Sequence, residues 1–532
     1  MQTRHSIRLG LLLTVAAGCA VATSPRVARA DDYSDLLDIL RAKGSLTGSE
    51  YNTLLAKHLH RGQASEVRSA TPVKGRRTAT ARHGTTTATV EDPVVFEAQR
   101  AADDAARSAR SAQEALAETR MSMKSASVVR VAPYVPGKGL TFSAGPVDIT
   151  LSGFINGFYS YNSPGGGHGV AGGVSTGSSK FDQSGVRNGL LPAGLILKVA
   201  TTQSGIDLAG TLGMYPGLNN AASGAFNANS GGSAVGLGTP GIDFRQVFMT
   251  AGTKTFGTVK IGRDLALFGS DAILSDATLL SVGSTGGTAA PGNTSLGRIG
   301  VGYVYADWIP QISYASPIYK GLQGTIGVFQ PLDEYNYAGS GLSATSIHHS
   351  SPMVQGKVTY DFTVNKLTGR IWSSFLVQRQ QSLTGSDIDT GGRPRSVVAE
   401  AGDIGTKLTW RGAQLVAYYY RGSGLGTTGL FFDGVATNGR KRASEGYYVQ
   451  FGYNFTKKFK LVGSYGVSNL YRAPGDYSPS LVRRNESEIG AGYYALTDWL
   501  TLVAEYAHTR SAARGPFKED DSTISAGAAI FF

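Results

Sequence analysis

Apolar and polar residues alternate with a period of two from Val147 almost to the C-terminus, and this pattern most constrains what the chain can form. The first stretch places Val147, Ile149 and Leu151 on one side and Asp148 and Thr150 on the other. Such alternation predicts β-strands with one apolar and one polar face. Because a soluble β-sandwich would show the same alternation, the connections between the strands have to distinguish the two classes.

The connections between the predicted strands are alternately short and long. Short turns are predicted near residues 202–205, 253–257, 318–321, 361–366, 411–413, 456–459 and 496–499. Long segments rich in Gly, Ser and Asn are predicted at residues 161–188, 216–241, 264–306, 331–351, 380–397, 422–445, 469–485 and 511–522. This asymmetry is typical of an all-β transmembrane barrel with periplasmic turns and extracellular loops, and it predicts about 16 antiparallel strands.

Composition supports the same class of protein. The 532 residues include 71 Gly and only 17% are charged, which suits many short strands joined by small-residue turns. No run of about eighteen apolar residues occurs after the N-terminal leader, so no membrane-spanning helix is expected. A membrane protein without such helices has to be a closed barrel, because only closure satisfies every backbone group in lipid. Aromatic residues near the strand ends, such as Tyr159, Tyr319 and Trp499, suit the bilayer interface.

Residues 1–30 have the pattern of a secretory signal peptide. Arg4 and Arg8 flank the start of an apolar core, and an A-x-A cleavage site ends at Ala30. The only cysteine, Cys19, leaves lipoprotein processing open as an alternative, because small residues precede it.

Three further segments are predicted before the barrel, which spans residues 140–532. Residues 31–60 predict a helical hairpin. Residues 61–92 predict a flexible basic linker, which is either solvated or in contact with anionic cell wall or lipid. Residues 93–130 predict a short coiled-coil helix, so that the N-terminal part forms a periplasmic stalk; its heptad core is Val95, Ala98, Ala102, Ala105, Ala109, Ala112, Leu116, Thr119 and Met123. Since Ala buries little area, this helix either joins three copies in a trimer or lies alone on the barrel rim.

Charge is distributed unevenly along the chain. The formal net charge is +12, and more than half of this excess lies before residue 139. The predicted barrel is therefore only mildly basic, which allows an anion preference without establishing one.

The stretch from residue 245 to residue 280 predicts a β-hairpin followed by a long segment that does not pair as a strand. Three cations bracket this segment and three acids lie at its start; they are Lys260, Arg263, Arg298, Asp264, Asp271 and Asp276. Cations on a wall that face acids on a loop would set up a transverse field, which filters ions by charge. The alternative is that the cations are ordinary hydrated residues and that the two later acids are solvated or cap a short helix at residues 275–280.

These residues resemble a known family. FRQVFMTAGTKTFGTVKIGRD (residues 244–264) looks like the signature hairpin of Gram-negative outer-membrane porins, and DWIPQISYASPIYKGLQGTIGVFQP (residues 307–331) resembles the unit that follows their constriction loop. The resemblance covers residues 140–532. It implies a homotrimer in the cell outer membrane, a water-filled pore in each protomer and a third extracellular loop folded inward. It implies that Arg263, at the end of the signature strand, and Arg245, on the preceding strand, lie at the pore constriction.

Other parts of the sequence extend the resemblance. The coiled-coil prefix is similar to a branch of trimeric porins, some of which take small carboxylates. The aromatic C-terminal strand, which ends at Phe532, resembles the signal that barrel-assembly machinery recognises. Clusters at residues 440–442 and 483–484 are expected to face outward, as solvated loop charges or as contacts for lipopolysaccharide phosphates.

Signals for other functions are weak. Residues 173–177 match the spacing of a nucleophile elbow and residues 167–172 that of a dinucleotide fingerprint, but both lie in a Gly/Ser-rich loop without the required helix. We therefore expect a channel for passive diffusion of small hydrophilic solutes, not an enzyme, with no catalytic residues, metal, cofactor or nucleic acid. The alternative is a barrel whose stalk tethers the outer membrane to the cell wall.

Overall fold

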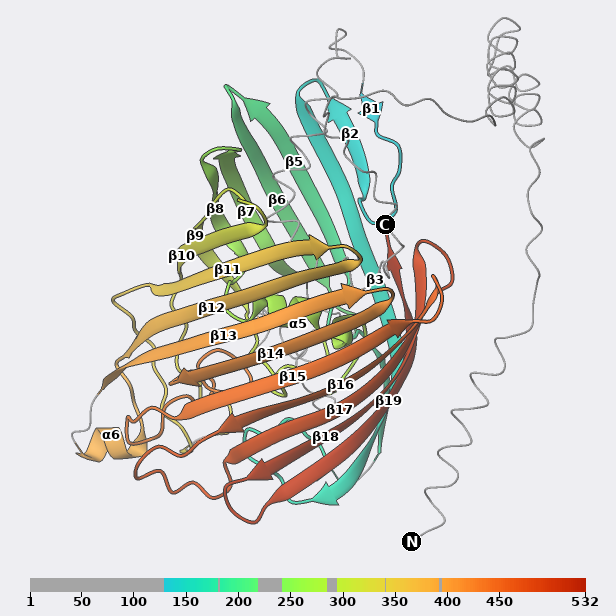
Figure 1. Cartoon of the computed structure of the whole chain (residues 1–532). Coiled ribbons are helices and arrows are strands. Elements are labelled where there is room, and N and C mark those ends of the chain that lie inside the picture. The colour runs from blue at the N-terminus through green and yellow to red at the C-terminus, as the bar shows by residue number, and fades with distance from the viewer. Residues whose placement is uncertain (1–128, 180–181, 219–241, 285–293, 340, 392–394) are drawn as a thin grey trace, which may run out of the picture. The chain divides into compact units, whose positions relative to one another are not determined.

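The computed structural model describes residues 129–179, 182–218, 242–284, 294–339, 341–391 and 395–532. These residues form one sheet of 19 strands, with short helices only in the connections (Figure 1). The predicted signal peptide, helical hairpin and basic linker, and the coiled-coil helix up to residue 128, lie outside the described residues. No helix in the described part of the chain is long and apolar enough to cross a membrane.

Sixteen of the 19 strands form a closed antiparallel ring, which confirms the predicted fold class. The ring runs from β3 (Val147–Gly167) to β5 and then through consecutive strands to β19. The bounds are β5 Gly194–Gln203, β6 Ile206–Pro216, β7 Ile242–Thr253, β8 Gly257–Leu265, β9 Trp308–Ala315, β10 Leu322–Phe329, β11 Met353–Val364, β12 Leu367–Gln381, β13 Ser396–Trp410, β14 Ala413–Ser423, β15 Ala443–Asn454, β16 Phe459–Leu470, β17 Val482–Ala495, β18 Leu500–Ala513 and β19 Lys518–Phe531.

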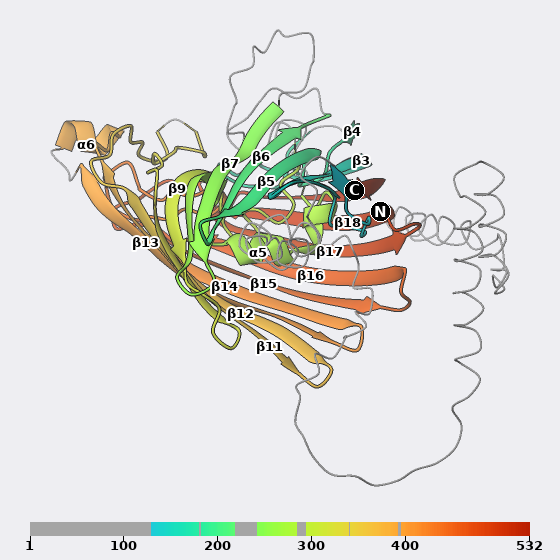
Figure 2. The same ribbon diagram turned by 90° about the horizontal axis from the view of Figure 1, so that it is seen from above.

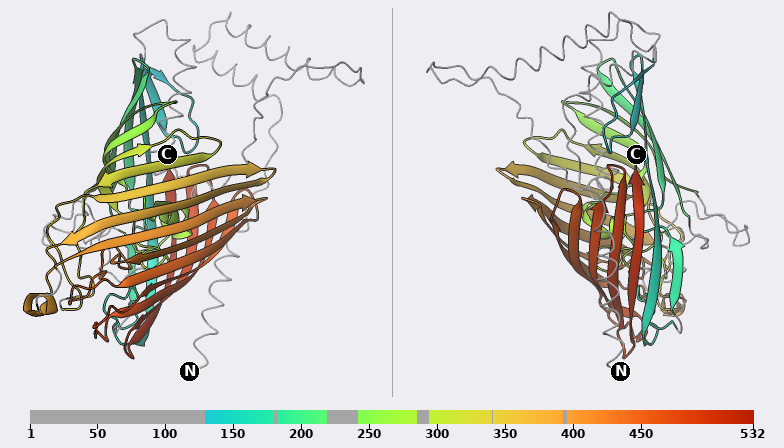
Figure 3. Two further views of the ribbon diagram at one scale, coloured as in Figure 1. Left: turned by 60° about the vertical axis from the view of Figure 1, so that its left-hand side comes forward. Right: turned by 90° about the vertical axis from the view of Figure 1, so that its right-hand side faces the viewer.

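The ring closes where β19 pairs with β3 (Figure 3). Ile524 lies opposite Tyr161, and the C-terminal Phe532 exchanges two backbone hydrogen bonds of 2.9 Å with Gly153. Closure matters because an unpaired strand edge in hydrocarbon would leave backbone groups unsatisfied.

The three remaining strands are short; two of them pair with the long strand β3, and the third pairs with one of these two. β2 (Leu140–Ala144) pairs with the start of β3, which β19 does not reach, and β1 (Arg130–Val131) pairs with β2. β4 (Gln183–Arg187) pairs with the second half of β3, beyond the residues that pair with β5.

Each predicted short turn joins two strands at one end of the barrel, here called the turn end. Three of these turns have both central residues at positive φ: Ser204-Gly205 at 51° and 79°, Lys320-Gly321 at 49° and 88°, and Arg411-Gly412 at 46° and 89°. This geometry matches the twist of the flanking strands in two-residue hairpins. The opposite end, here called the loop end, carries the long connections.

One predicted long connection is wrong. Residues 511–522 were expected to form a loop, but β18 and β19 extend through most of this segment and leave only residues 514–517 between them. The strands continue beyond the apolar band, where both faces are polar, so a search for apolar alternation ends too early.

The connection between β8 and β9 folds into the ring, as predicted for the third loop (Figure 2). We call residues 266–284 and 294–307 the inner segment. It contains α5 (Ser270–Ser275) and the 3-10 helix η1 (Ala277–Leu280), and all its residues up to 306 are buried. By contrast, the helix α6 (Ser386–Gly391) lies in the loop-end connection after β12.

Candidate functional site

The start of the inner segment is held by polar side chains of the inner wall. Oε1 of Gln355 on β11 accepts hydrogen bonds from the backbone N–H groups of Leu267 and Phe268 at 2.9 and 2.8 Å. Asp403 on β13 accepts one from the N–H of Gly269 at 3.0 Å. Both wall side chains are buried, so each satisfies backbone donors that water does not reach.

The later part of the inner segment is held by the strands that follow. Tyr448 and Gln450 on β15 donate to the carbonyls of Ala272 and Ser275 at 2.7 and 3.1 Å. Glu505 on β18 accepts from the N–H groups of Val282 and Gly283 at 3.1 and 2.6 Å and from the Ser281 hydroxyl. The inner segment therefore follows the wall in an arc from β11 to β18.

Asp271 on α5 joins the inner segment to two cations of the wall. Its carboxylate accepts a hydrogen bond from Lys357 Nζ at 2.7 Å and another from Arg370 Nη1 at 3.1 Å. Arg370 also makes a bidentate contact with Asp361 at 2.7 and 2.8 Å. The predicted acid on the loop therefore meets the cations of β11 and β12 directly.

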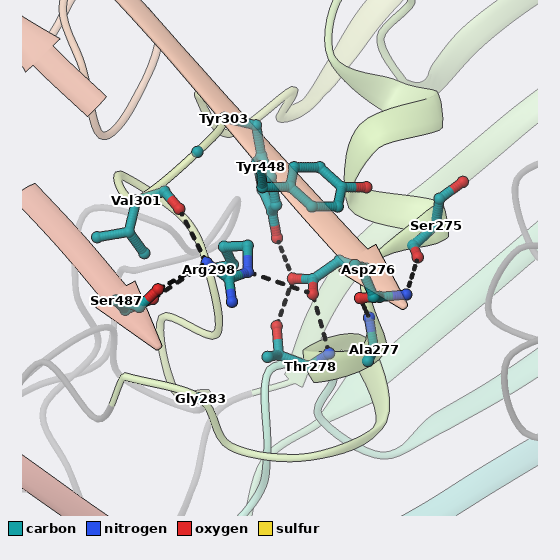
Figure 4. A network of polar contacts seen from close by, with 12 residues as sticks. Ser275, Asp276, Ala277, Thr278, Gly283, Arg298, Val301, Tyr303, Tyr448 and Ser487 are labelled. Atoms are coloured by element: carbon teal, nitrogen blue, oxygen red, sulfur yellow. Dashed lines mark hydrogen bonds and ion pairs between the residues drawn. The ribbon is translucent and has the colours of Figure 1, made fainter. Parts of the chain in front are cut away.

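Asp276 and Arg298 form a buried pair that connects two parts of the inner segment (Figure 4). Both side chains are 0% exposed, and their charged atoms lie 3.9 Å apart. Asp276 also caps η1 by accepting from the N–H of Thr278 at 3.0 Å, and it accepts from the Tyr303 hydroxyl at 2.9 Å. The helix cap that the sequence offered as an alternative for Asp276 is therefore present.

Arg298 is also fixed from the wall side. Its Nη1 donates to the hydroxyl of Ser487 on β17 at 3.1 Å and to the carbonyl of Val301 at 3.3 Å. The buried position of this side chain gives it a role in the packing of the inner segment.

The remaining predicted charges form local pairs on β7 and β8. Lys260 is ion-paired with Asp264 and lies over the Phe248 ring at 4.9 Å. Arg245 binds Asp243 at 2.8 Å, and both are buried. Only the Lys260 side chain of these four keeps appreciable exposure, at 17%.

Arg263 lies on the other face of its strand, so the prediction that it points into the pore is corrected. It is opposite Val247, which is 46% exposed, and two residues after Ile261, which is 41% exposed. Its Nη1 donates to the carbonyl of Trp308 at 2.5 Å. Because the faces of a strand alternate residue by residue, a motif position does not determine the side on which its residue points.

Sequence reasoning missed a group of cations on the inner face near the turn end. We call Lys357, Arg370, Lys407 and Lys460 the basic stripe. Lys407 lies two strand periods from the inward-facing Asp403, and Lys460 is opposite the buried Tyr493. Each stands on the polar side of an alternating strand, a signal that could have identified them.

The described residues contain no group of three His, Cys, Asp or Glu side chains arranged to hold a metal. The arrangement is instead a buried loop fixed inside a closed barrel, with ionised side chains between the loop and the turn end.

Solved structures of other proteins are similar to this chain. The outer membrane channel DcaP of Acinetobacter baumannii superposes with a TM-score of 0.53 at 16% identity, over 73% of this chain and 99% of that chain. OprB of Pseudomonas putida gives a TM-score of 0.46 at 13% identity, over 73% of this chain and 94% of that chain. At these identities the likeness concerns the fold alone.

Sequence comparison identifies the family. No curated protein matches this sequence. The family model of the Gram-negative porins matches residues 106–514, which is most of the chain and nearly all of the barrel. Together with the closed ring of strands and the buried third loop, this match shows that the chain belongs to the Gram-negative porins and is an outer-membrane channel.

Proposed function

We propose that this porin lets small hydrophilic solutes diffuse passively across the outer membrane and prefers anions. The observation that carries the preference is the basic stripe. Its four cations lie on the inner face of β11, β12, β13 and β16, on the turn-end side of the inner segment. Asp271 accepts hydrogen bonds from Lys357 and Arg370, and Asp361 accepts hydrogen bonds from Arg370. The local excess of positive charge would raise the concentration of anions in this part of the lumen.

The constriction is assigned to the space between the inner segment and the wall of β5 to β8. Half-buried side chains that face inward lie there, among them Lys198, Asp207, Thr211 and Lys260. Of the charges predicted from sequence, Lys260 is retained as a lining residue, whereas Asp264 and Asp271 are buried partners of Lys260 and Lys357. Arg245, Asp276 and Arg298 hold the wall and the inner segment in place.

We also propose that the channel is a homotrimer whose contact face is the outer side of β19, β3, β5 and β6. Large exposed side chains on this side are mainly aliphatic; they include Ile155, Leu195, Val199, Leu208, Leu212, Ile524 and Ile530. On β9 to β18 the turn end instead carries exposed aromatic residues, including Tyr319, Tyr360, Trp410, Tyr453, Tyr494 and Trp499. Aromatic belts suit the lipid interface, whereas an aliphatic face without such a belt suits contact with another protomer.

Two further partners remain proposals. Lipopolysaccharide phosphates fit the exposed cations at the loop end, such as Arg421 and Arg510, whose side chains are 67% and 44% exposed. Barrel-assembly machinery fits the aromatic C-terminus, where the ring of Phe532 lies 6.0 Å from that of Trp499. A tether to the cell wall would depend on residues outside the described part of the chain.

Reversal potential in a salt gradient tests the proposed preference. Purified trimer is placed in a planar bilayer between two concentrations of potassium chloride. We expect discrete conductance steps and a reversal potential that lies between zero and the equilibrium potential of chloride. A reversal potential between zero and the equilibrium potential of potassium would exclude the anion preference, and the absence of steps would exclude the channel.

A further inference from the structure

A second loop-end connection also folds into the barrel. We call residues 424–442, between β14 and β15, the mouth segment. We propose that the mouth segment forms a second constriction, placed between the loop-end mouth and the inner segment, and that it limits the size of solute the channel admits. This proposal rests on the proposed channel function and adds a second filter to it.

Burial first distinguishes the mouth segment from an ordinary surface loop. Leu425, Thr428, Phe431 and Val435 are all 0% exposed, although they lie in a long connection of a barrel. Leu425 and Phe431 belong to the same apolar cluster as the inner segment. An extracellular loop normally runs over the surface, whereas most of the mouth segment is buried and packs against the inner segment.

The mouth segment is in direct contact with the inner segment. The N–H of Tyr305 donates to the carbonyl of Thr428 at 3.0 Å. A Cβ added to Gly300 would lie 2.9 Å from Oγ1 of Thr428, so Gly300 packs closely against the Thr428 side chain. The two loops are therefore stacked, and a solute that passes the first meets the second.

The connection between β10 and β11 holds the mouth segment from the other side. The N–H of Asp433 donates to the carbonyl of Tyr335 at 2.9 Å, and the N–H of Val435 donates to Glu334 Oε1 at 2.7 Å. The Tyr335 and Phe432 rings lie 4.9 Å apart. The mouth segment is thus clamped between two other loops.

Its backbone is strained at Phe431, whose φ of 64° lies in the left-handed region that bulky side chains seldom occupy. Such conformations persist where the surroundings over-determine them, and they gather at functional sites.

Arg442 anchors the C-terminal end of the mouth segment. Its guanidinium is 0% exposed; Nε binds Asp476 at 2.7 Å, and Nη1 donates to the Ser343 hydroxyl at 2.6 Å and to the Asp433 carbonyl at 3.1 Å. Arg514 is ion-paired with the same Asp476 carboxylate. Arg442 was expected to face outward with its neighbours, but it is the buried centre of a network that joins four connections.

The base of the mouth segment allows a clean deletion. A Cβ added to Gly434 would lie 3.1 Å from the backbone N of Gly426, so these residues are adjacent in space. Removal of residues 427–433 joins Gly426 to Gly434 and keeps Arg442 in the chain.

The test compares this deletion with the full-length trimer. Single-channel conductance is recorded in planar bilayers, and entry of neutral sugars of increasing size is followed by liposome swelling. We expect the deletion to raise conductance severalfold and to admit larger sugars. A trimer that folds, as judged by heat-modifiable migration in SDS gels, and keeps the original conductance and size limit would overturn the proposal.

A point variant covers the case in which the deletion does not fold. Phe431→Ala removes a buried ring from the mouth segment, whereas Tyr477→Ala removes a ring that is 86% exposed. We expect only the first variant to raise conductance, and equal conductance in both would overturn the proposal. Absence of conductance from the unaltered protein and all variants would instead overturn the channel function itself.

Discussion

Arg370 on β12 and Lys407 on β13 lie directly opposite each other in the sheet. Like charges in this position normally destabilise a strand pair. Here the charge of Arg370 is balanced by Asp361 and Asp271, which hold its guanidinium. Arg370 and Lys407 therefore place two positive charges side by side on the inner face, and the two carboxylates offset the repulsion between them.

Removal of the Lys407 charge is expected to weaken the anion preference. In Lys407→Gln the inner face loses one unit of positive charge near the turn end, so the reversal potential should move toward that of potassium. Lys366→Gln makes the same change in the exposed turn between β11 and β12 and should leave the reversal potential unchanged. Equal shifts in both variants would show that general surface charge sets the selectivity.

Removal of the Asp271 carboxylate is expected to have the opposite effect on selectivity. Asp271→Asn leaves Lys357 without its carboxylate partner on the inner segment and strengthens the local positive field, so the reversal potential should move further toward that of chloride. Because the pair is largely buried, the change should also cost about 3–5 kcal/mol of stability, seen as a lower temperature of heat-modifiable unfolding. Asp387→Asn, at an exposed site on α6, is the matched control, and a shift toward potassium in Asp271→Asn would contradict the assignment.

Glu505 is expected to keep the inner segment in place. Glu505→Gln puts an amide donor where the carboxylate accepts from Ser281, Val282 and Gly283. A buried donor left unpaired costs about 1–3 kcal/mol, so the inner segment should loosen and the open-channel current should become noisier. Glu488→Gln, on the exposed face of β17, serves as the control. A current as quiet as that of the unaltered channel would remove Glu505 from this role.

Two carboxyl groups in the loop-end connections, those of Glu334 and Asp476, are expected to make local stability depend on pH in opposite directions. Burial raises the pKa of Glu334 well above its ordinary value. A raised pKa in the folded state means that the stabilisation is present at acidic pH and is lost as the pH rises toward and through the folded-state pKa. Glu334→Gln should therefore raise the hydrogen-exchange protection factors of residues 332–338 at neutral pH and remove the pH dependence of those factors. Faster exchange in this variant at neutral pH would contradict the prediction.

The pKa of Asp476 is shifted in the opposite direction to that of Glu334. Burial alone would raise its pKa, but Arg442 and Arg514 outweigh burial and lower the pKa to about 2. The stability it contributes is present above the ordinary value of 3.8 and is lost only as the pH falls toward 2. The ion pairs of Asp476 with Arg442 and Arg514 are therefore expected to persist over the range in which Glu334 titrates, and the hydrogen-exchange protection factors of residues 471–481 should stay constant there.

The fold was predictable because its signals are local. The turn residues, the period of two and the alternation of short and long connections can each be read within a few residues, and they placed every short turn, including those at Ser204-Gly205 and Arg411-Gly412. The segment after β8 was also recognisable, because it lacks the alternation that pairing requires.

The remaining features depend on contacts between distant residues. Gln355, Asp403 and Glu505 are ordinary polar residues of alternating strands until the inner segment lies against them. Arg442 looked like a surface cation because its partner Asp476 is 34 residues away along the chain. The direction of Arg263 depends on which alternate residues of β8 face the lumen, and the motif does not specify them.

The most direct test places a charged label on two adjacent residues of β11. Lys357→Cys puts a thiol on the inner face, and Val358→Cys puts one on the outer face, where the valine is 50% exposed; Cys19 is replaced by Ser in both. A negatively charged methanethiosulfonate reagent is added during planar-bilayer recording. Modification at position 357 should change the conductance and move the reversal potential toward that of potassium, whereas modification at position 358 should change neither. A silent position 357, or equal effects at both positions, would contradict a solute path along the inner face beside the buried loop.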